Sequence, residues 1–392
     1  MKRILLYGFM ASMGVMANAT ETVSENNEAM PVAEPETAAE SVETPKMTAW
    51  QQVLSRMPKV SGFLQTGYDY NSYGKGSSTF EAKRLEVALS GTLAPKATYF
   101  AQVEAYSGIA GTTNNHDQTN IQVIDAYVDY RFCPQFGVRL GQFCTPFGIE
   151  NYYIGPSHLE TIDYSNLCYR LSDRNPLTYN YIDYGRELGI MFMGELLPSN
   201  KGFNYLSYNL AITNGTVPCK VDNNKSKDII AQIAVQPVKH LKINAGYQWS
   251  QSKTLWGEQE KALPFYVNFN RAIFGFWYND PEGLDLRAEY GFGTAKKHGD
   301  EYVKEHGAYV LAGYRFGKWQ PLLRWDMYRD DQDKVNPLTN YNRILAGCNW
   351  QVFKQIRIQL NYQLSIYGGL AKETNHDEGT SSQLQVMALV TF

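Results

Sequence analysis

The feature that most constrains this chain is a series of segments in which apolar and polar side chains alternate. Clear examples are residues 124–132 (IDAYVDYRF), 356–364 (IRIQLNYQL) and 383–392 (QLQVMALVTF). Successive side chains of a strand point to opposite faces, so each of these segments has one apolar and one polar face. The alternation predicts an all-β fold, although a soluble β-sandwich would show the same pattern.

Short turns recur along the chain and separate the two possibilities. They lie at residues 94–96, 133–136, 198–201, 237–240, 280–283, 316–318 and 352–355. Consecutive short turns enclose two strands of roughly ten residues, the length that crosses a bilayer at a tilt, and one longer polar loop. Seven short turns and eight long loops make fifteen connections. We therefore predict that residues 59–392 form a transmembrane antiparallel β-barrel of sixteen strands.

Aromatic residues support a membrane location for this barrel. On the apolar faces they close the strands that run toward the short turns, at Phe132, Phe316, Trp350, Phe392 and either Phe276 or Tyr278. Amphipathic rings of this kind gather where lipid meets water. The composition agrees, with 14% aromatic residues and 28 tyrosines. A bilayer leaves no backbone group unpaired, which a closed barrel satisfies. The predicted location is the outer membrane.

The N-terminal region differs from the rest. Residues 1–19 have a basic start, an apolar stretch and a small-residue cleavage site, as a signal peptide does. Residues 20–58 are predicted to be an acidic, disordered leader ending in a short helix at 49–57. The whole chain carries a net charge of −3. Without Lys2 and Arg3 and the seven leader glutamates, the remainder carries +2, which gives no basis for nucleic-acid binding.

One connection is far longer than the others. Residues 143–185 lie between two strand-like segments and keep neither a strand nor a helix period. Connections of this length are uncommon and usually functional, and this one is too rich in tyrosine to be disordered by composition. As the third long loop, it is predicted to fold into the barrel lumen. Its charged residues are Arg170, Arg174, Glu150, Glu160, Asp163, Asp173 and Asp183.

Several segments resemble those of a known family. They are residues 139–150 (RLGQFCTPFGIE), 185–189 (GRELG), 323–328 (LRWDMY) and 357–362 (RIQLNY). In this order they resemble the phosphate-selective porin O and P family, over about residues 60–392. The resemblance implies a sixteen-stranded porin that is usually a homotrimer, with the third external loop folded inward as a constriction. It does not carry phosphate selectivity over, because the long loop contains no lysine.

Strand parity places a line of arginines inside the barrel. One comes from each of five consecutive strands, at Arg287, Arg315, Arg324, Arg343 and Arg357. Glu160, Asp163 and Asp173 of the long loop are expected to face this line, with Arg170 and Arg174 nearby. Opposed charges across a narrow wet passage favour polar or charged solutes. The alternative is that the arginines pair with Glu289, Asp326 and their neighbours as solvated lumen charges.

Other chemistry has little support in the sequence. The histidines at positions 116, 298, 306 and 376 fall in predicted outer loops without metal-ligand spacing. Ser157, His158 and Asp163 match no catalytic motif, so we predict no enzyme activity and no cofactor. Cys144 and Cys168 share the long loop, and a disulfide between them is left open.

Three functions follow from these observations. The first is an outer-membrane porin for passive diffusion of small hydrophilic solutes, constricted by residues 143–185. The second is a channel that prefers anions or phosphate, using the arginine line. The third is a plugged barrel with a structural or surface-binding role.

Overall fold

The computed structural model describes residues 57–105, 121–172, 185–215, 222, 226–256, 263–296, 302–330, 341–368 and 379–392. The signal peptide and residues 20–56 of the leader lie outside these ranges, so their boundaries stay predictions. The first strand begins at Lys59.

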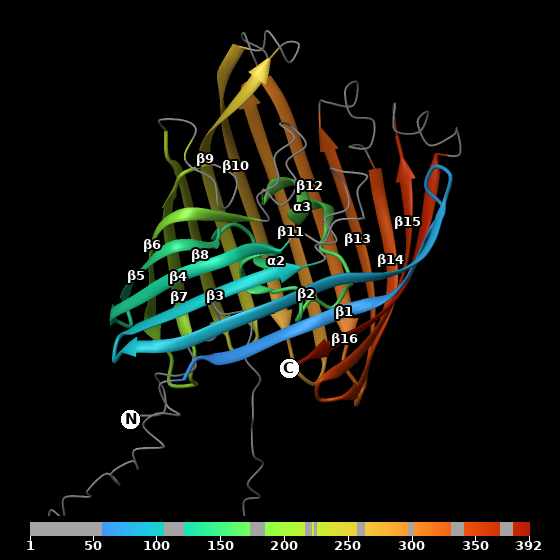
Figure 1. Cartoon of the computed structure of the whole chain (residues 1–392), viewed down its shortest axis with the longest axis horizontal. Coiled ribbons are helices and arrows are strands. Elements are labelled where there is room, and N and C mark those ends of the chain that lie inside the picture. Colours follow the sequence, from blue (N-terminus) through green and yellow to red (C-terminus); the bar gives the residue numbers. More distant parts are fainter. Residues whose placement is uncertain are drawn as a thin grey trace, which may run out of the picture.

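Sixteen strands form one closed sheet in the described chain (Figure 1). Each strand pairs antiparallel with its neighbours in sequence, and β1 pairs with β16 to close the ring. The strands are β1 (Lys59–Asn71), β2 (Ser77–Ala94), β3 (Ala97–Ala105), β4 (Gln122–Cys133), β5 (Phe136–Cys144), β6 (Arg186–Pro198), β7 (Asn204–Thr213), β8 (Asp228–Val238), β9 (Leu241–Trp256), β10 (Leu263–Asn279), β11 (Leu284–Lys296), β12 (Tyr302–Tyr314), β13 (Trp319–Asp330), β14 (Tyr341–Phe353), β15 (Ile356–Tyr367) and β16 (Thr380–Thr391). The prediction of a sixteen-stranded barrel is confirmed, and all seven short turns lie where the sequence placed them.

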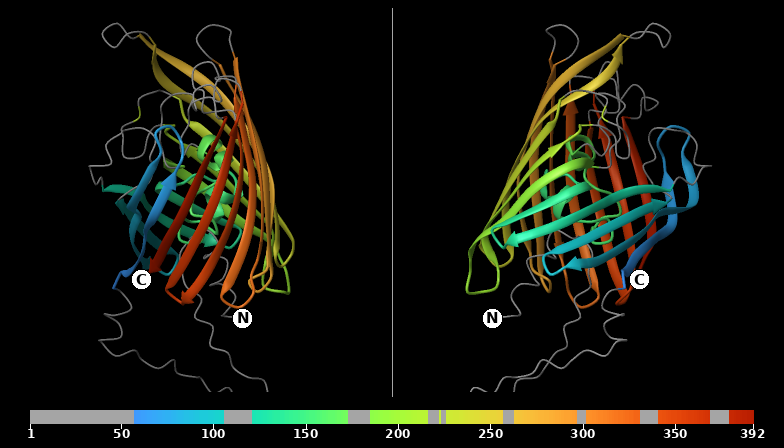
Figure 2. Two further views of the ribbon diagram at one scale, coloured as in Figure 1. Left: turned by 90° about the vertical axis from the view of Figure 1, so that its right-hand side faces the viewer. Right: turned by 60° about the vertical axis from the view of Figure 1, so that its left-hand side comes forward.

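Two short helices interrupt the strand order within the described residues. They are α2 (Ile149–Tyr153) and α3 (Asn166–Leu171), both between β5 and β6. No helix in the described ranges is long and apolar enough to cross a membrane. Figure 2 shows the tilt of the strands and the long β9–β10 hairpin, which rises beyond its neighbours at the end opposite the short turns.

The sheet is apolar outside and largely polar inside. On β15, Leu360 and Tyr362 are 43% and 48% exposed, whereas Gln359 and Asn361 are 0% and 1% exposed. The predicted girdle residues Phe132, Phe316, Trp350 and Phe392 are exposed, and so is Phe276 at the fifth position. Trp319 and Trp350 stack with ring centroids 5.4 Å apart on adjacent strands. Outward apolar residues are the expected surface of a barrel in lipid.

This surface predicts how the barrel responds to a buried charge. Leu360→Arg should lower the free energy of unfolding by about 3 kcal/mol, because a guanidinium at mid-membrane loses its hydration. Urea unfolding in lipid vesicles measures the effect. Gln355→Arg, in the exposed turn before β15, is the control and should change stability by less than about 0.5 kcal/mol. Equal losses in both variants would show that the β15 surface does not face lipid.

Candidate functional site

The two ends of the segment between β5 and β6 are hydrogen-bonded to each other, and we call these contacts of Thr145, Asn151 and Gly185 the neck. We call the described part of this segment, residues 145–172, the insert. The Thr145 N–H and hydroxyl donate to the Gly185 carbonyl at 2.9 and 3.2 Å. Asn151 donates its side-chain amide to the Thr145 carbonyl at 3.0 Å. Gly185 has φ +66°, and a Cβ there would lie 2.4 Å from Asn151 Oδ1. The neck therefore depends on glycine at this position.

The insert has a small hydrophobic core of its own. Its buried members are Ile149, Ile154, Leu159, Tyr164 and Cys168. The Tyr164 hydroxyl donates to the Ile154 carbonyl at 2.9 Å, and Ser165 caps α3 by accepting the Cys168 N–H at 3.2 Å. Because these contacts lie within one short segment, the insert is a compact body rather than an extended loop.

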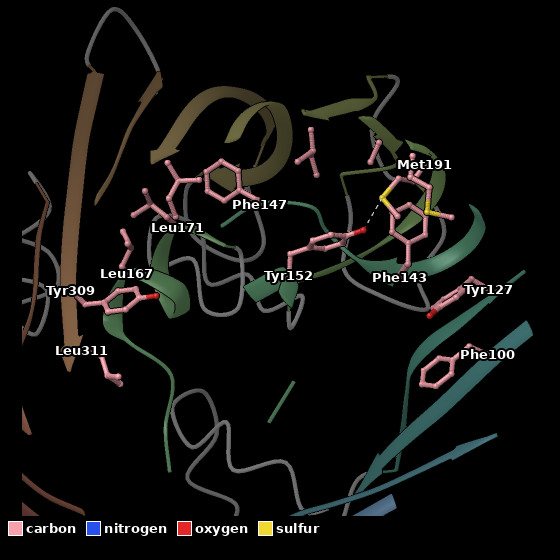
Figure 3. Packing of buried hydrophobic residues seen from close by; sticks show 14 of the residues in the cluster. Phe100, Tyr127, Phe143, Phe147, Tyr152, Leu167, Leu171, Met191, Tyr309 and Leu311 are labelled. Atoms are coloured by element: carbon pink, nitrogen blue, oxygen red, sulfur yellow. Dashed lines mark hydrogen bonds between the residues drawn. The ribbon is translucent and has the colours of Figure 1, made fainter. Parts of the chain in front are cut away.

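Apolar side chains fasten this body to the barrel wall. Figure 3 shows Leu167 beside Tyr309 and Tyr152 close to Met191, with Leu171 and Phe147 in the same cluster. Helix α3 lies against β11, β12 and β13. The wall contributes inward apolar residues that break the polar-inside pattern, among them Met191, Ala211, Ile230, Ile273 and Leu311. The sequence analysis missed this contact, although apolar residues at inward positions were a signal for it.

Two of the predicted arginines bind the acidic side chains of the insert. Arg287, which is fully buried, pairs with Glu150 at 3.3 Å and with Glu160 at 3.0 Å. Arg315, just beyond the end of β12, pairs with Glu160 at 3.5 Å and with Asp285 at 2.5 Å. Glu160 therefore lies between Arg287 and Arg315, two residues of the arginine line.

Two more arginines bind backbone carbonyl groups of the insert. Arg324 donates to the carbonyls of Asp163 and Tyr164 at 2.8 and 3.4 Å. Arg357 donates to the carbonyls of Ser157 and Leu159 at 3.0 and 2.9 Å. Carbonyl groups without secondary-structure partners need donors when buried, and these guanidinium groups supply them. We call residues 157–164 the tip of the insert.

The remaining predicted residues differ from these four arginines. Arg343 stays on the wall, where it donates to the Ser365 hydroxyl at 3.2 Å and lies 5.3 Å from the Tyr341 ring centroid. Arg170, on α3, lies 5.9 Å from the Tyr328 ring centroid. Asp173 and Arg174 lie outside the described residues.

The Asp163 carboxylate has its close partners on β2 and β16. It accepts from Lys83 at 3.0 Å, and it lies 3.4 Å from Arg84 and 3.1 Å from the Gln385 amide. A register shift in β2 pairs Gln65 with Arg84 and Thr66 with Ala82, which leaves Lys83 as an extra residue. Lys83 and Arg84 are both buried as a result. Alternation cannot reveal such a bulge, so the sequence analysis missed Lys83.

Glu289 on β11 is a further contact that sequence reasoning missed. Its carboxylate accepts the N–H groups of Ile149 and Glu150 at 2.5 and 3.1 Å, and the Tyr309 hydroxyl at 2.8 Å. The sequence suggested that it would pair with a wall arginine. It instead holds the start of α2, beside Gly148 at φ +86°.

The pairing fixes the ionisation of Glu160 and Asp163. Burial alone would raise the pKa of Glu160, but the charges of Arg287 and Arg315 and a hydrogen bond to Asp285 hold that pKa at about 2. Burial would likewise raise the pKa of Asp163, and Lys83 and Arg84 instead hold it well below its usual value. Both carboxyl groups are therefore ionised at physiological pH.

The structure also bears on metals and disulfides. In the parts of the chain that are described, no group of three or more His, Cys, Asp or Glu residues is arranged to hold a metal ion. Cys144 and Cys168 form no disulfide, and the Cys144 thiol lies 3.2 Å from the Asn151 carbonyl. His306 belongs to β12 rather than to a loop, which corrects its predicted position.

Several solved structures share this architecture. The anion-selective porin from Comamonas acidovorans has a TM-score of 0.59 and 14% identity, over 86% of this chain and 99% of that chain. The outer-membrane channel DcaP of Acinetobacter baumannii has a TM-score of 0.58 and 13% identity, over 86% and 97%. A trimer form of OmpT from Vibrio cholerae has a TM-score of 0.54 and 10% identity, over 86% and 99%. At these identities the likeness is one of fold.

Sequence comparison identifies the family. An uncharacterized protein of Aquifex aeolicus (strain VF5) is 26% identical over 235 residues, which are 59% of this chain and 47% of that protein. The match thus spans about half the length of that relative. The model of the family described as phosphate-selective porin O and P matches residues 59–253 and 272–392. Since this match includes most of the barrel, this outer-membrane protein belongs to the phosphate-selective porin O and P family.

Proposed function

We propose that this protein is a porin for passive diffusion of small hydrophilic solutes, narrowed by residues 143–185 folded into the lumen. The main support for the proposal is where, in the closed order of strands, the wall residues that contact the tip of the insert lie. The neck joins β5 to β6, whereas Arg324, Arg357 and Gln385, which contact the tip, stand on β13, β15 and β16. In a ring of sixteen strands, β13 lies opposite the neck. A segment that contacts both sides crosses the interior.

The pairing of the arginines argues for weak ion preference. Arg287 and Arg324 are 0% and 1% exposed, and their charges are directed at the insert. They are therefore not available to a passing anion. Arg343 and Arg357 are only half-buried, and a preference for anions remains the second candidate because of them. The family description and the anion-selective Comamonas porin support that candidate.

One observation favours a third candidate, a barrel whose lumen is filled. Inward residues are buried on strands all around the ring, and Gln65, Gln232, Arg287, Arg324 and Gln359 are each at most 1% exposed. Single-channel recording in planar bilayers separates the candidates. A filled barrel gives no current, and the reversal potential in a salt gradient gives the ion preference of an open one.

The proposed assembly is a homotrimer in outer-membrane lipid. The trimer form of the OmpT structure and the family resemblance support it. Electrophoresis of the unheated protein, with chemical cross-linking as a second measure, tests the subunit number. A single barrel in both experiments would contradict the proposal.

Arg324→Ala should release the tip, because it removes the donors to two tip carbonyls and leaves Asp326 without its 3.0 Å ion pair. We expect single-channel conductance to rise by about twofold or more and the current to become noisier. Arg343→Ala is the matched control, since Arg343 bonds to Ser365 on the wall. It should shift the reversal potential toward cations with little change in conductance. Identical recordings from the two variants would mean that Arg324 does not hold the tip.

Deletion of residues 152–180, with a short glycine–serine linker, removes the tip and α3 together. A sixteen-stranded barrel without an insert encloses a wide aqueous channel, so we expect conductance to rise by severalfold. Heat-dependent electrophoretic mobility checks that the barrel still folds. Conductance that stays at the wild-type level in a folded barrel would place the insert outside the passage.

Glu160→Gln should lower stability at neutral pH by about 3 kcal/mol, because Arg287 and Arg315 lose a buried partner. The Glu160 pKa falls from 4.5 to about 2 on folding, so its contribution is complete above pH 4.5 and disappears as the pH falls through about 2. Urea unfolding at pH 7, 4 and 2 should therefore show a difference from wild type that shrinks with acidity. Glu282→Gln, in an exposed turn, is the control. A difference that is independent of pH would contradict the ion pairing.

A further inference from the structure

A row of tyrosines lines the inner wall at the long-loop end of the barrel. Tyr341 and Tyr367 face each other on β14 and β15, with ring centroids 5.8 Å apart. Tyr73, in the connection after β1, lies 6.1 Å from Tyr367. Tyr341 and Tyr367 share the strand parity of the buried Asn349 and Gln359, so their rings point into the barrel. Tyr73 and Tyr367 are half-buried, whereas Tyr341 is 5% exposed.

Hydroxyl and amide groups of β15 and β16 surround these rings. The Tyr367 and Ser381 hydroxyls are 2.9 Å apart, and Arg343 donates to Ser365 at 3.2 Å. The side-chain amide nitrogen of Gln363 donates to Gln383. The amide oxygen of Gln363 is buried and has no hydrogen-bond partner in the described structure. We call Tyr73, Tyr341, Tyr367 and these polar neighbours the tyrosine strip.

The charges beside the tyrosine strip cancel. Asp69 accepts from the Gln383 amide, which is itself hydrogen-bonded to Gln363. With Arg343, which donates to Ser365, the groups hydrogen-bonded into the strip carry one negative and one positive charge. A site with balanced charge has no net attraction for an anion or a cation. The chemistry presented to a solute is therefore aromatic faces with neutral hydrogen-bonding groups.

We propose that the tyrosine strip binds neutral saccharides at the long-loop end of the lumen, beside the insert, whose Asn166 accepts a hydrogen bond from the Tyr341 hydroxyl. A pyranose has an apolar face of C–H groups that can lie on a tyrosine ring, and its rim of hydroxyls can bond to amide, hydroxyl and carboxylate groups. Apolar faces with a few placed polar groups are the usual composition of a small-molecule site. This inference rests on the proposed function, since it names the solute class of that same passage.

Calorimetry of the detergent-solubilised protein with maltohexaose tests the binding directly and requires no conductance. Maltohexaose should bind the wild type, and Tyr73→Ala and Tyr367→Ala should each weaken binding by about fivefold. Tyr367→Phe keeps the ring and should bind within about twofold of wild type. Tyr362→Ala, on the lipid-facing side of β15, is the control and should bind as wild type does. If Tyr367→Ala does not fold, by its heat-dependent mobility, Tyr73→Ala decides.

The outcomes separate this site from the channel itself. Binding of pyrophosphate without binding of maltohexaose would overturn the proposal in favour of an anion site. Equal affinity in wild type and Tyr73→Ala would overturn it as well. In planar bilayers, maltohexaose should interrupt the ion current of the wild type more than that of Tyr73→Ala. If no ion current is seen but maltohexaose still binds and binding still depends on Tyr73, the porin function is contradicted and the saccharide site is supported.

Discussion

The interior of this barrel depends on the pairing of buried charges. Strands point arginines, lysines and carboxylates inward, and the insert then separates many of them from water. An unpaired charge in such a place costs several kcal/mol, so each one needs an opposite charge or a polar backbone group. Arg287 with Glu150 and Glu160, and Asp163 with Lys83, meet this need across the gap between insert and wall. The same contacts determine where the insert lies.

The irregular backbone of the insert is the second half of this arrangement. Residues 157–164 form neither a helix nor a strand, and their carbonyl groups have no neighbours in a sheet. Arg324 and Arg357 donate to four of these carbonyls. Guanidinium groups suit this task because each presents several donors in a fixed plane. Four arginines of this line therefore hold the segment through its carbonyl and carboxylate groups.

The contacts also explain why an outer-membrane barrel carries apolar residues inside. Ile273 and Leu311 would be out of place against water, but they lie against the insert. The insert has its own core, and the wall supplies a second one. The position of the insert is thus determined by apolar packing on one of its sides and by charge pairing at its tip.

Local pattern in the sequence was sufficient for the barrel. Alternation and turn spacing determine strand number, pairing order and the outward face, because each depends on neighbours in the chain. The inward parity of Arg287, Arg324 and Arg357 followed from the same rule. Strand parity could not identify the groups that these arginines bind. Whether an arginine meets a solute, a carboxylate or a carbonyl depends on a segment more than a hundred residues away.

Tertiary structure decided the rest. The β2 bulge places Lys83 beside Arg84, and alternation alone assigns Lys83 to the outer face. The Asp163 carboxylate consequently pairs with Lys83 on β2, while its carbonyl accepts from Arg324. Glu289 binds backbone N–H groups of α2, a contact that no spacing encodes. Sequence determined which side chains enter the barrel, because the pleat of a strand is local. Only the folded chain determined what they contact, because closing the ring brings distant strands together.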